Sequence, residues 1–354
     1  MLHVFGNLNG KAEFVARIFI TLFLMLDFFI IATYFLAAPL GLSLLFGTSE
    51  GMTYAERNSM FYILILMMPF RIPAELNIGG LFAVMMVVYT VCLVTSWWLS
   101  PNLQQTIRDM VGISPLRIFR NWILSMPLIS SMLLISIILL QSFQEAQGVS
   151  TGSITFASNF EALAELAYSP LLEEIGFRIT PIGVFLAIES VFIWRMRRRA
   201  GSPISLPKLM ALSFLTPERS RKFAGLKTIE ENGLLRGIGL PGWIVLLATS
   251  LAFGAAHFLS GSGWEIGKIS SAFVAGLALS LVYWRYGAHS AVLLHWFFNY
   301  YSYVYQLASE TYANIFSKIL YAMEDVTFWF GIFGWMAILM LFVFRMYGRT
   351  REKA

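Results

Sequence analysis

The amino-acid sequence predicts an all-α, polytopic membrane protein, a helical bundle of about eight transmembrane helices around a polar intramembrane cavity. Residues of the AVILMFWYC set make up 58% of the 354 residues, and charged residues make up 13%, about half of the ~25% found in soluble chains. The apolar runs are long and continuous, which excludes a transmembrane β-barrel with its alternating strands. This composition also excludes a soluble enzyme, a disordered chain and a collagen-like chain, and the single cysteine, Cys92, excludes a disulfide scaffold.

The spans follow from the apolar runs, because a helix needs about 20 apolar residues to cross ~30 Å of hydrocarbon. The first run, 14–46, is too long for the apolar core of a signal peptide, so we expect a retained span whose N-terminus lies inside. The run 61–70 is short and contains Pro69, with Pro73 beyond it, which favours an interfacial or re-entrant piece. The other predicted spans are 78–99, 122–143, 156–194, 243–258, 269–286, 288–307 and 326–344.

The run 156–194 differs from the others because it carries several ionisable residues and is unusually long. Its length fits one extended helix or two elements, with Pro170 and Pro181 as candidate breaks. This is therefore the run in which a polar site inside the membrane is most strongly indicated.

Basic residues predict which side of the membrane each connection faces, because cytoplasmic loops are enriched in Lys and Arg. The densest basic cluster, 195–199, opens a polar stretch to residue 236 that we expect to be a cytoplasmic loop. With the basic tail 345–353 also inside, both termini are expected in the cytoplasm, and the membrane is expected to be the plasma membrane. The net charge of +5 reflects these segments, so the expected partner is the lipid bilayer and not a nucleic acid.

The first candidate functional cluster contains two adjacent carboxylates and an arginine. Ionisable side chains inside a bilayer cost ~2.5–3.5 kcal/mol each on insertion scales, so each needs a partner or a function. Glu174 and Arg178 are four residues apart, which places them on one face of a helix where they can pair. Glu173 lies about 100° round the helix, outside that geometry. The motif offers one anchored carboxylate and one poised to take a proton; a structural ion-pair network is the alternative.

Two further polar positions lie in later apolar runs. His257 follows Phe253 by four residues, and His295 precedes Asn299 by four. His295 and Asn299 therefore share a helix face, among Trp and Phe side chains that cannot satisfy them. Each must find a polar partner or water inside the bundle. A buried structural histidine is the alternative at either position, and the coincidence of all three clusters favours a function.

These residue types together can hydrolyse a peptide bond. Glu and His can act as general bases on water, and His and Asn can donate to a developing oxyanion, so no Ser or Cys nucleophile is required. Two His and a Glu could also bind zinc, but the HExxH motif is absent and the residues come from three separate segments. We therefore expect no metal ion and no cofactor.

The motifs EExxxR, FxxxH and HxxxN, in this order on separate predicted spans, resemble those of the CPBP family. This family comprises the type II CAAX prenyl endopeptidases and the bacteriocin-processing or Abi proteins. The resemblance covers roughly residues 156–307 and implies an all-helical membrane bundle around a conical cavity, with glutamate-dependent peptide hydrolysis. It implies that the first Glu and the His of FxxxH activate water, that the His and Asn of HxxxN hold the oxyanion, and that the second Glu and the Arg position the first Glu. The resulting catalytic residues are Glu173, Glu174, His257, His295 and Asn299, with Arg178 and Phe253 in positioning roles.

The prediction is thus an intramembrane endopeptidase acting on a membrane-associated peptide or protein substrate. Residues 1–150 would be N-terminal transmembrane helices of unassigned role, 151–310 the catalytic core, and 311–354 the last helix and a basic cytoplasmic tail. A catalytically silent scaffold or regulator on the same fold and a proton-coupled transporter stay open. The complete motif set disfavours the former, and the lack of internal repeats disfavours the latter. Prenylated C-terminal peptides, bacteriocin leaders and other membrane peptides are all open as substrates.

Overall fold

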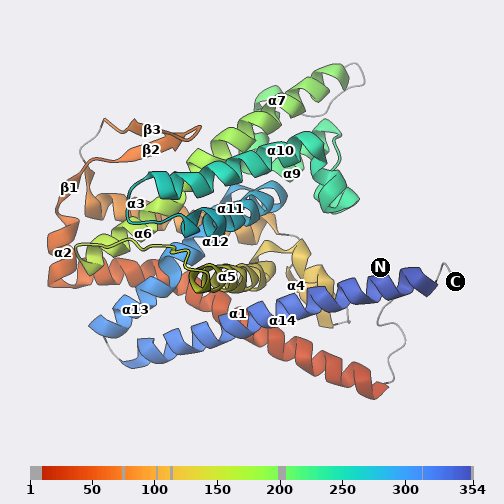
Figure 1. Cartoon of the computed structure of the whole chain (residues 1–354), viewed down its shortest axis with the longest axis horizontal. Coiled ribbons are helices and arrows are strands. Elements are labelled where there is room, and N and C mark those ends of the chain that lie inside the picture. Colours follow the sequence, from red (N-terminus) through yellow and green to blue (C-terminus); the bar gives the residue numbers. More distant parts are fainter. Residues whose placement is uncertain are drawn as a thin grey trace.

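The computed structural model is a bundle of long helices, which confirms the predicted all-α membrane fold (Figure 1). Among the residues that it describes, seven helices are long and apolar enough to cross a membrane, and the chain is an integral multi-pass membrane protein. The described residues are 10–73, 76–100, 103–111, 115–197, 205–312 and 314–351. The helices that contain the seven spans are α1 (Gly10–Gly47), α3 (Ile78–Leu99), α5 (Trp122–Ala146), the continuous helix 159–197, α10 (Ile229–Leu259), α11 (Gly267–Tyr286) and α14 (Asn314–Arg351).

The predicted span 288–307 is helical, but it is divided into three consecutive elements. Helix α12 (Ala288–Trp296) leads into the π-helical turn η4 (Phe297–Tyr301), which leads into α13 (Ser302–Thr311). No non-helical residue separates the three, so at ~1.5 Å per residue the combined helix is long enough to cross the hydrocarbon. It is not among the seven helices that are both long and apolar enough to cross a membrane, because it carries many polar residues, so the described residues hold seven candidate spans where about eight were predicted.

The run 156–194 forms one continuous helix and not two elements. Helix α6 (Asn159–Glu174), the π-helical turn η2 (Ile175–Ile179) and α7 (Thr180–Arg197) follow one another without a break. Neither Pro170 nor Pro181 interrupts this helix, although both lie within it. The π-helical turn lies between the two prolines, and turns of this kind occur frequently at functional sites.

The segment predicted to be interfacial or re-entrant contains a β-hairpin. Strands β2 (Tyr62–Ile65) and β3 (Met68–Arg71) pair antiparallel across a turn formed by Leu66 and Met67, both with positive φ. The N–H group of Met67 donates to Gly176 O at 3.1 Å, so the hairpin is fixed to the π-helical turn η2. The pair of β1 (Asn58–Ser59) with β4 (Leu76–Asn77) flanks this hairpin, and α2 (Ser49–Ala55) precedes it.

The polar stretch 195–236, predicted as a loop, is largely helical over its described residues. It contains α8 (Leu206–Leu215), α9 (Pro217–Ala224) and the beginning of α10 (Ile229–Leu259). The backbone of α10 is non-helical at Gly233 and Gly239, so the predicted span 243–258 lies in the continuous helix that follows this kink. The loop prediction was wrong because it took the polar residues as solvent-facing, whereas two of them, Glu218 and Arg221, form ion pairs inside the fold.

Two ion pairs fix α9 against the membrane helices. Arg221, which is buried, pairs with Glu189 of α7 and donates to the backbone oxygen of Gly237 in α10 at 3.2 Å. Glu218 accepts from Arg285 Nη1 of α11 at 3.0 Å. Burial raises the pKa of Glu218, and its hydrogen bonds from α10 and Arg285 oppose that shift. These contacts explain why a strongly charged segment packs here and does not extend into solvent.

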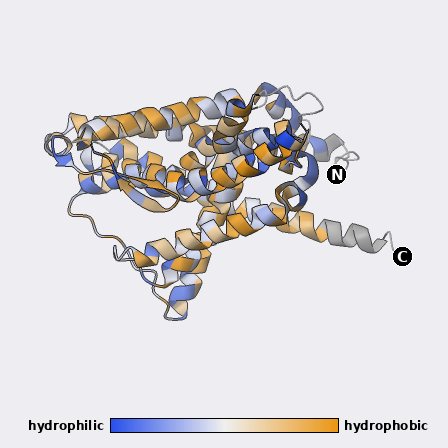
Figure 2. Ribbon diagram, turned by 90° about the horizontal axis from the view of Figure 1, so that it is seen from above, coloured by the Kyte–Doolittle hydropathy of each residue, from blue (hydrophilic) through white to orange (hydrophobic). Residues whose placement is uncertain are grey.

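The ends of the bundle differ in polarity. Figure 2 shows hydrophobic residues along the long helices and hydrophilic residues mainly near their ends and in the connections. In Figure 1 the start of α1 and the ends of α7 and α14 point to the same side as α4 (Leu103–Val111) and α9, whereas the β-hairpin lies on the opposite side. The segments rich in Arg and Lys therefore gather at one end of the molecule.

Candidate active site

Glu174 and Arg178 form the pair that their spacing predicts. Arg178 Nη1 donates to Glu174 Oε1 at 3.0 Å, and both side chains are fully buried. The Arg178 guanidinium carbon lies 3.9 Å from the centroid of the Phe253 ring, a distance typical of a cation–π contact. Gly276 of α11 leaves room for this guanidinium, because a Cβ atom there would lie 3.1 Å from Arg178 Nη2. Glu174 is therefore the anchored carboxylate of the two.

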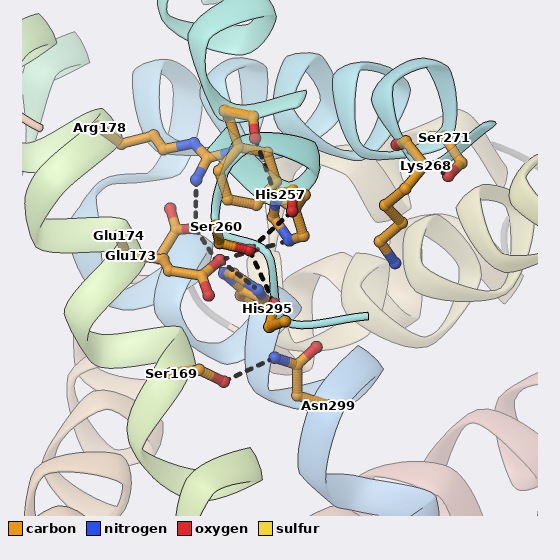
Figure 3. Close-up of polar contacts among 12 residues, drawn as sticks. Ser169, Glu173, Glu174, Arg178, His257, Ser260, Lys268, Ser271, His295 and Asn299 are labelled. Carbon is orange, nitrogen blue, oxygen red and sulfur yellow. Dashed lines mark hydrogen bonds and ion pairs between the residues drawn. The ribbon is translucent and has the colours of Figure 1, made fainter. Parts of the chain in front are cut away.

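The site converges on one oxygen of Glu173. His295 Nε2 lies 3.6 Å from Glu173 Oε2, and His257 Nε2 lies 3.9 Å from the same atom (Figure 3). This oxygen is buried and has no hydrogen-bond partner among the described residues. The structure thus brings together three side chains from α6, α10 and α12, which lie far apart in the sequence.

The second nitrogen of each imidazole ring faces a hydrogen-bond acceptor. His257 Nδ1 lies 2.9 Å from the backbone oxygen of Phe253, and His295 Nδ1 lies 2.8 Å from Glu174 Oε1. A backbone carbonyl only accepts, so His257 carries its hydrogen on Nδ1. Glu174, as an ionised member of a salt bridge, likewise accepts from His295. In their neutral forms both rings therefore turn a bare Nε2 toward Glu173.

The Phe253 ring fills the space between the charged groups of the site. It stands edge-on to the His257 ring, with centroids 4.6 Å apart, and edge-on to the His295 ring at 5.8 Å. The same ring contacts the Arg178 guanidinium. Phe253 is fixed in turn by the close approach of α10 to α11, because a Cβ atom on Gly254 would lie 2.4 Å from the Ile269 backbone oxygen. A single aromatic side chain therefore positions three polar ones.

Asn299 lies beside this centre but makes a different contact. Its Nδ2 donates to Ser169 Oγ at 2.9 Å, and Figure 3 shows the amide oxygen of Asn299 turned away from Ser169. Ser169 precedes Glu173 by four residues on α6, and Asn299 follows His295 by four, so two antiparallel helix faces meet along both pairs. Sequence reasoning missed Ser169, because a serine in a helix carries no pattern of its own.

The centre formed by Glu173, His257 and His295 holds three acceptors and no donor when both rings are neutral. A water molecule supplies what is lacking, since it can donate to two acceptors and keep a lone pair for attack on a carbonyl carbon. The arrangement is therefore suited to binding and deprotonating water. Among the described residues, no group of three or more His, Cys, Asp or Glu side chains is arranged to hold a metal ion. The expectation that no metal or cofactor takes part stays a prediction.

Fold and site together define a polytopic membrane protein with a buried carboxylate–imidazole centre. Residues 155–301 match the family model described as Type II CAAX prenyl endopeptidase Rce1-like. The matched segment runs from just before α6 to the end of η4 and contains all three motifs, which confirms the predicted resemblance to CPBP family intramembrane proteases. At the level of the family, this match supports a CAAX-protease-like intramembrane endopeptidase. Comparison of the chain with curated proteins and with solved structures gives no match.

Proposed function

We propose that the protein is an intramembrane endopeptidase that hydrolyses a peptide bond of a membrane-associated substrate with water activated by Glu173. The observation that supports this most directly is the buried, unpartnered Oε2 of Glu173, toward which His257 and His295 both turn Nε2. Such a cluster is costly inside a bilayer unless it binds a molecule that brings hydrogen-bond donors. The match of residues 155–301 to a peptidase family agrees with this function.

In the proposed reaction Glu173 accepts a proton from a water molecule whose second O–H donates to His257 Nε2. The resulting hydroxide attacks the substrate carbonyl carbon and forms a tetrahedral oxyanion. His295 and Asn299 stabilise this oxyanion; His295 donates through Nε2 only when both of its ring nitrogens carry hydrogen, with Glu174 accepting from Nδ1. Glu173 then passes its proton to the leaving amine as the C–N bond breaks, and this step regenerates the carboxylate.

Contacts with neighbouring side chains orient His295 and Asn299 in this reaction. Glu174, held by Arg178, fixes the orientation of the His295 ring through Nδ1. Ser169 accepts one hydrogen of the Asn299 amide, which leaves the other hydrogen free for the substrate. We assign a positioning role to Glu174, Arg178 and Ser169, and a direct role to Glu173, His257, His295 and Asn299.

We also propose that both termini lie in the cytoplasm of a cell whose plasma membrane holds the protein. The start of α1 and the end of α14 lie at the same end of the bundle as α4, α9 and the basic end of α7 (Figure 1). Lys and Arg are enriched in cytoplasmic connections. Labelling of single cysteines placed before α1 and after α14 in intact cells tests this orientation.

The substitution Glu173→Gln tests the catalytic proposal. It keeps the shape of the side chain and removes the base, so cleavage of a fluorogenic peptide by the reconstituted protein should fall by about 10²–10⁴-fold. The melting temperature in detergent should stay unchanged. Glu165→Gln, an exposed position on the same helix, is the matched control and should remain active.

Two other outcomes would contradict the assignment. If Glu174→Gln is inactive but stable while Glu173→Gln still cleaves, the base is Glu174 and the two roles are exchanged. If both variants cleave as fast as the unsubstituted protein, neither carboxylate is the base. Failure of the unsubstituted protein to cleave any peptide in a diverse library would favour the silent scaffold.

A further inference from the structure

A half-buried ammonium group lies beside the proposed active site and takes no part in the reaction described above. Lys268 stands in the first turn of α11, and its Nζ lies 3.7 Å from the centroid of the Trp264 ring. It is absent from the ion pairs found among the described residues. A cation–π contact of roughly 0.5–2 kcal/mol only partly replaces the hydration that a half-buried ammonium loses. Lys268 is therefore a half-buried cation that has an aromatic contact but no anionic partner among the described residues.

Backbone contacts hold the segment that carries Trp264, the residue on which Lys268 rests. Trp264 forms a β-bridge with Gly152 in the segment before α6, and Gly267 N–H donates to the backbone oxygen of Ser150 at 2.9 Å. A Cβ atom on Gly152 would lie 2.3 Å from the Gly263 backbone oxygen, so the two segments are in close contact. This packing joins the segment that carries Trp264 to the segment that leads into α6, the helix of Glu173.

Lys268 is directed toward the centre of the site. Its ammonium interacts electrostatically with Glu173 and with His257, although neither is a direct contact. The Trp264 ring on which it rests lies 6.4 Å from the His257 ring, centroid to centroid. Figure 3 shows Lys268 on one side of His257 and the carboxylates with Arg178 on the other. A peptide whose scissile bond lies over Glu173 and which extends past His257 therefore reaches Lys268.

We propose that Lys268 binds a carboxylate of the substrate within a few residues of the scissile bond, a role that rests on the proposed peptidase function. Arg178, the other cation of the site, is already paired with Glu174, so Lys268 is the cation left for a substrate anion. A single ammonium suits a monoanion, whereas phosphate groups are usually bound by several cations or by a bidentate arginine. An extended peptide advances ~3.3 Å per residue, so the carboxylate lies a short way along the chain.

A substrate carboxylate has two sources, the free C-terminus and an Asp or Glu side chain. Three internally quenched peptides distinguish them, all derived from one sequence that the unsubstituted protein cleaves. The first ends in a free carboxylate, the second in an amide, and the third in an amide with a Glu near the cleaved bond. The protein is reconstituted in phosphatidylcholine vesicles, so that no anionic lipid competes for the ammonium.

The substitution Lys268→Met removes the charge and keeps an unbranched apolar side chain. For the peptide that carries the recognised carboxylate, KM should rise by about tenfold, as expected when a charge-assisted hydrogen bond is lost. Its kcat, and the kcat/KM of the neutral amide, should change by less than about twofold. Lys268→Arg should restore the low KM, and Lys318→Met on α14, a loss of the same charge elsewhere, should have no effect.

Two results would overturn the proposal. One is an equal fall in kcat/KM for the acidic and neutral peptides, which would mean that Lys268 supports Glu173 or the fold and does not bind substrate. The other is no change for any peptide. Peptide binding to the Glu173→Gln variant, followed by fluorescence anisotropy with and without Lys268→Met, tests the same contact even if no peptide is cleaved. A preference for the acidic peptide that Lys268→Met abolishes supports the anion site, and a lack of preference contradicts it.

Discussion

The two π-helical turns, η2 and η4, both begin within two residues of a member of the Glu–His centre, but different interactions hold them in place. The turn η2 carries the buried ion pair of Arg178 with Glu174 and is covered by the β-hairpin. Leu66 N–H donates to Thr180 Oγ1 at 2.9 Å just after the turn. An ion pair and hydrogen bonds to the hairpin therefore hold η2 in place.

The turn η4 is held by aromatic packing instead. The Tyr300 ring stacks on Trp296 with centroids 4.7 Å apart, and Trp296 stacks on Tyr89 of α3 at 4.2 Å. This turn presents the neutral amide of Asn299, which needs a fixed backbone and one hydrogen-bond partner. A turn that presents a charge needs an oppositely charged partner as well, because an unpaired charge inside the bundle is costly. The two turns should thus respond differently to substitution.

The largest effect is expected in η2, from Arg178→Ala. This change leaves the Glu174 carboxylate buried without its partner, and breaking such a pair costs ~3–5 kcal/mol in soluble proteins. Both the melting temperature in detergent and the cleavage rate should fall, whereas Asn299→Ala in η4 should reduce cleavage and leave the melting temperature almost unchanged. Equal melting temperatures for the two variants would remove the distinction between the turns.

An intermediate effect is expected from Gly176→Ala, which acts on the contact between η2 and the hairpin. The new Cβ atom would lie 2.5 Å from the Leu64 Cβ, and overpacking of this kind costs ~1–3 kcal/mol. In a double-mutant cycle, the loss of stability caused by Gly176→Ala should be smaller on a Leu64→Gly background, which lacks the Cβ atom of residue 64. It should persist on a Leu64→Ala background, which keeps that atom. Thermal melts of the four-member cycles check this, and a cost independent of residue 64 would show that the hairpin does not constrain the turn.

The smallest effect is expected from Ser169→Ala, which acts on Asn299 of η4. Loss of one neutral hydrogen bond should lower kcat by roughly three- to tenfold, with KM and stability little changed. Ser169→Thr keeps the hydroxyl and should retain most of the activity. A Ser169→Ala variant with unchanged kcat would mean that the Asn299 amide is already fixed by its own turn.

The sequence was sufficient to predict the helical bundle, its apolar spans and the ion pair of Glu174 with Arg178. Long apolar runs and the spacing of four residues depend only on helix geometry and on the cost of charge in a bilayer. The proximity of Glu173, His257 and His295 was also anticipated, because isolated polar groups in a membrane protein must find partners. Their roles in catalysis stay predictions.

Other features could not be predicted from local patterns. A π-helical turn adds one residue to a helix and leaves no trace in composition, so η2 and η4 were missed. The hairpin residues 62–71 form an apolar run too short for a span, and such a run does not distinguish a strand from a re-entrant helix. Ser169 and Lys268 belong to no motif and become candidates only through contacts between helices that are distant in the sequence.

The fixed Nδ1 hydrogens of the two imidazoles have a consequence for inhibitor chemistry. With His257 and His295 each committed through Nδ1, the two neutral rings and the Glu173 carboxylate offer lone pairs to a ligand, and neither neutral ring offers it a proton. Compounds rich in N–H or O–H groups, such as amidines, hydrazides and boronic acids in their hydrated form, match such a space. Compounds without such groups leave the lone pairs of the two neutral rings and of Glu173 without a donor. A fragment screen should therefore be enriched in small donors at this centre, with a carboxylate appended on the side of Lys268.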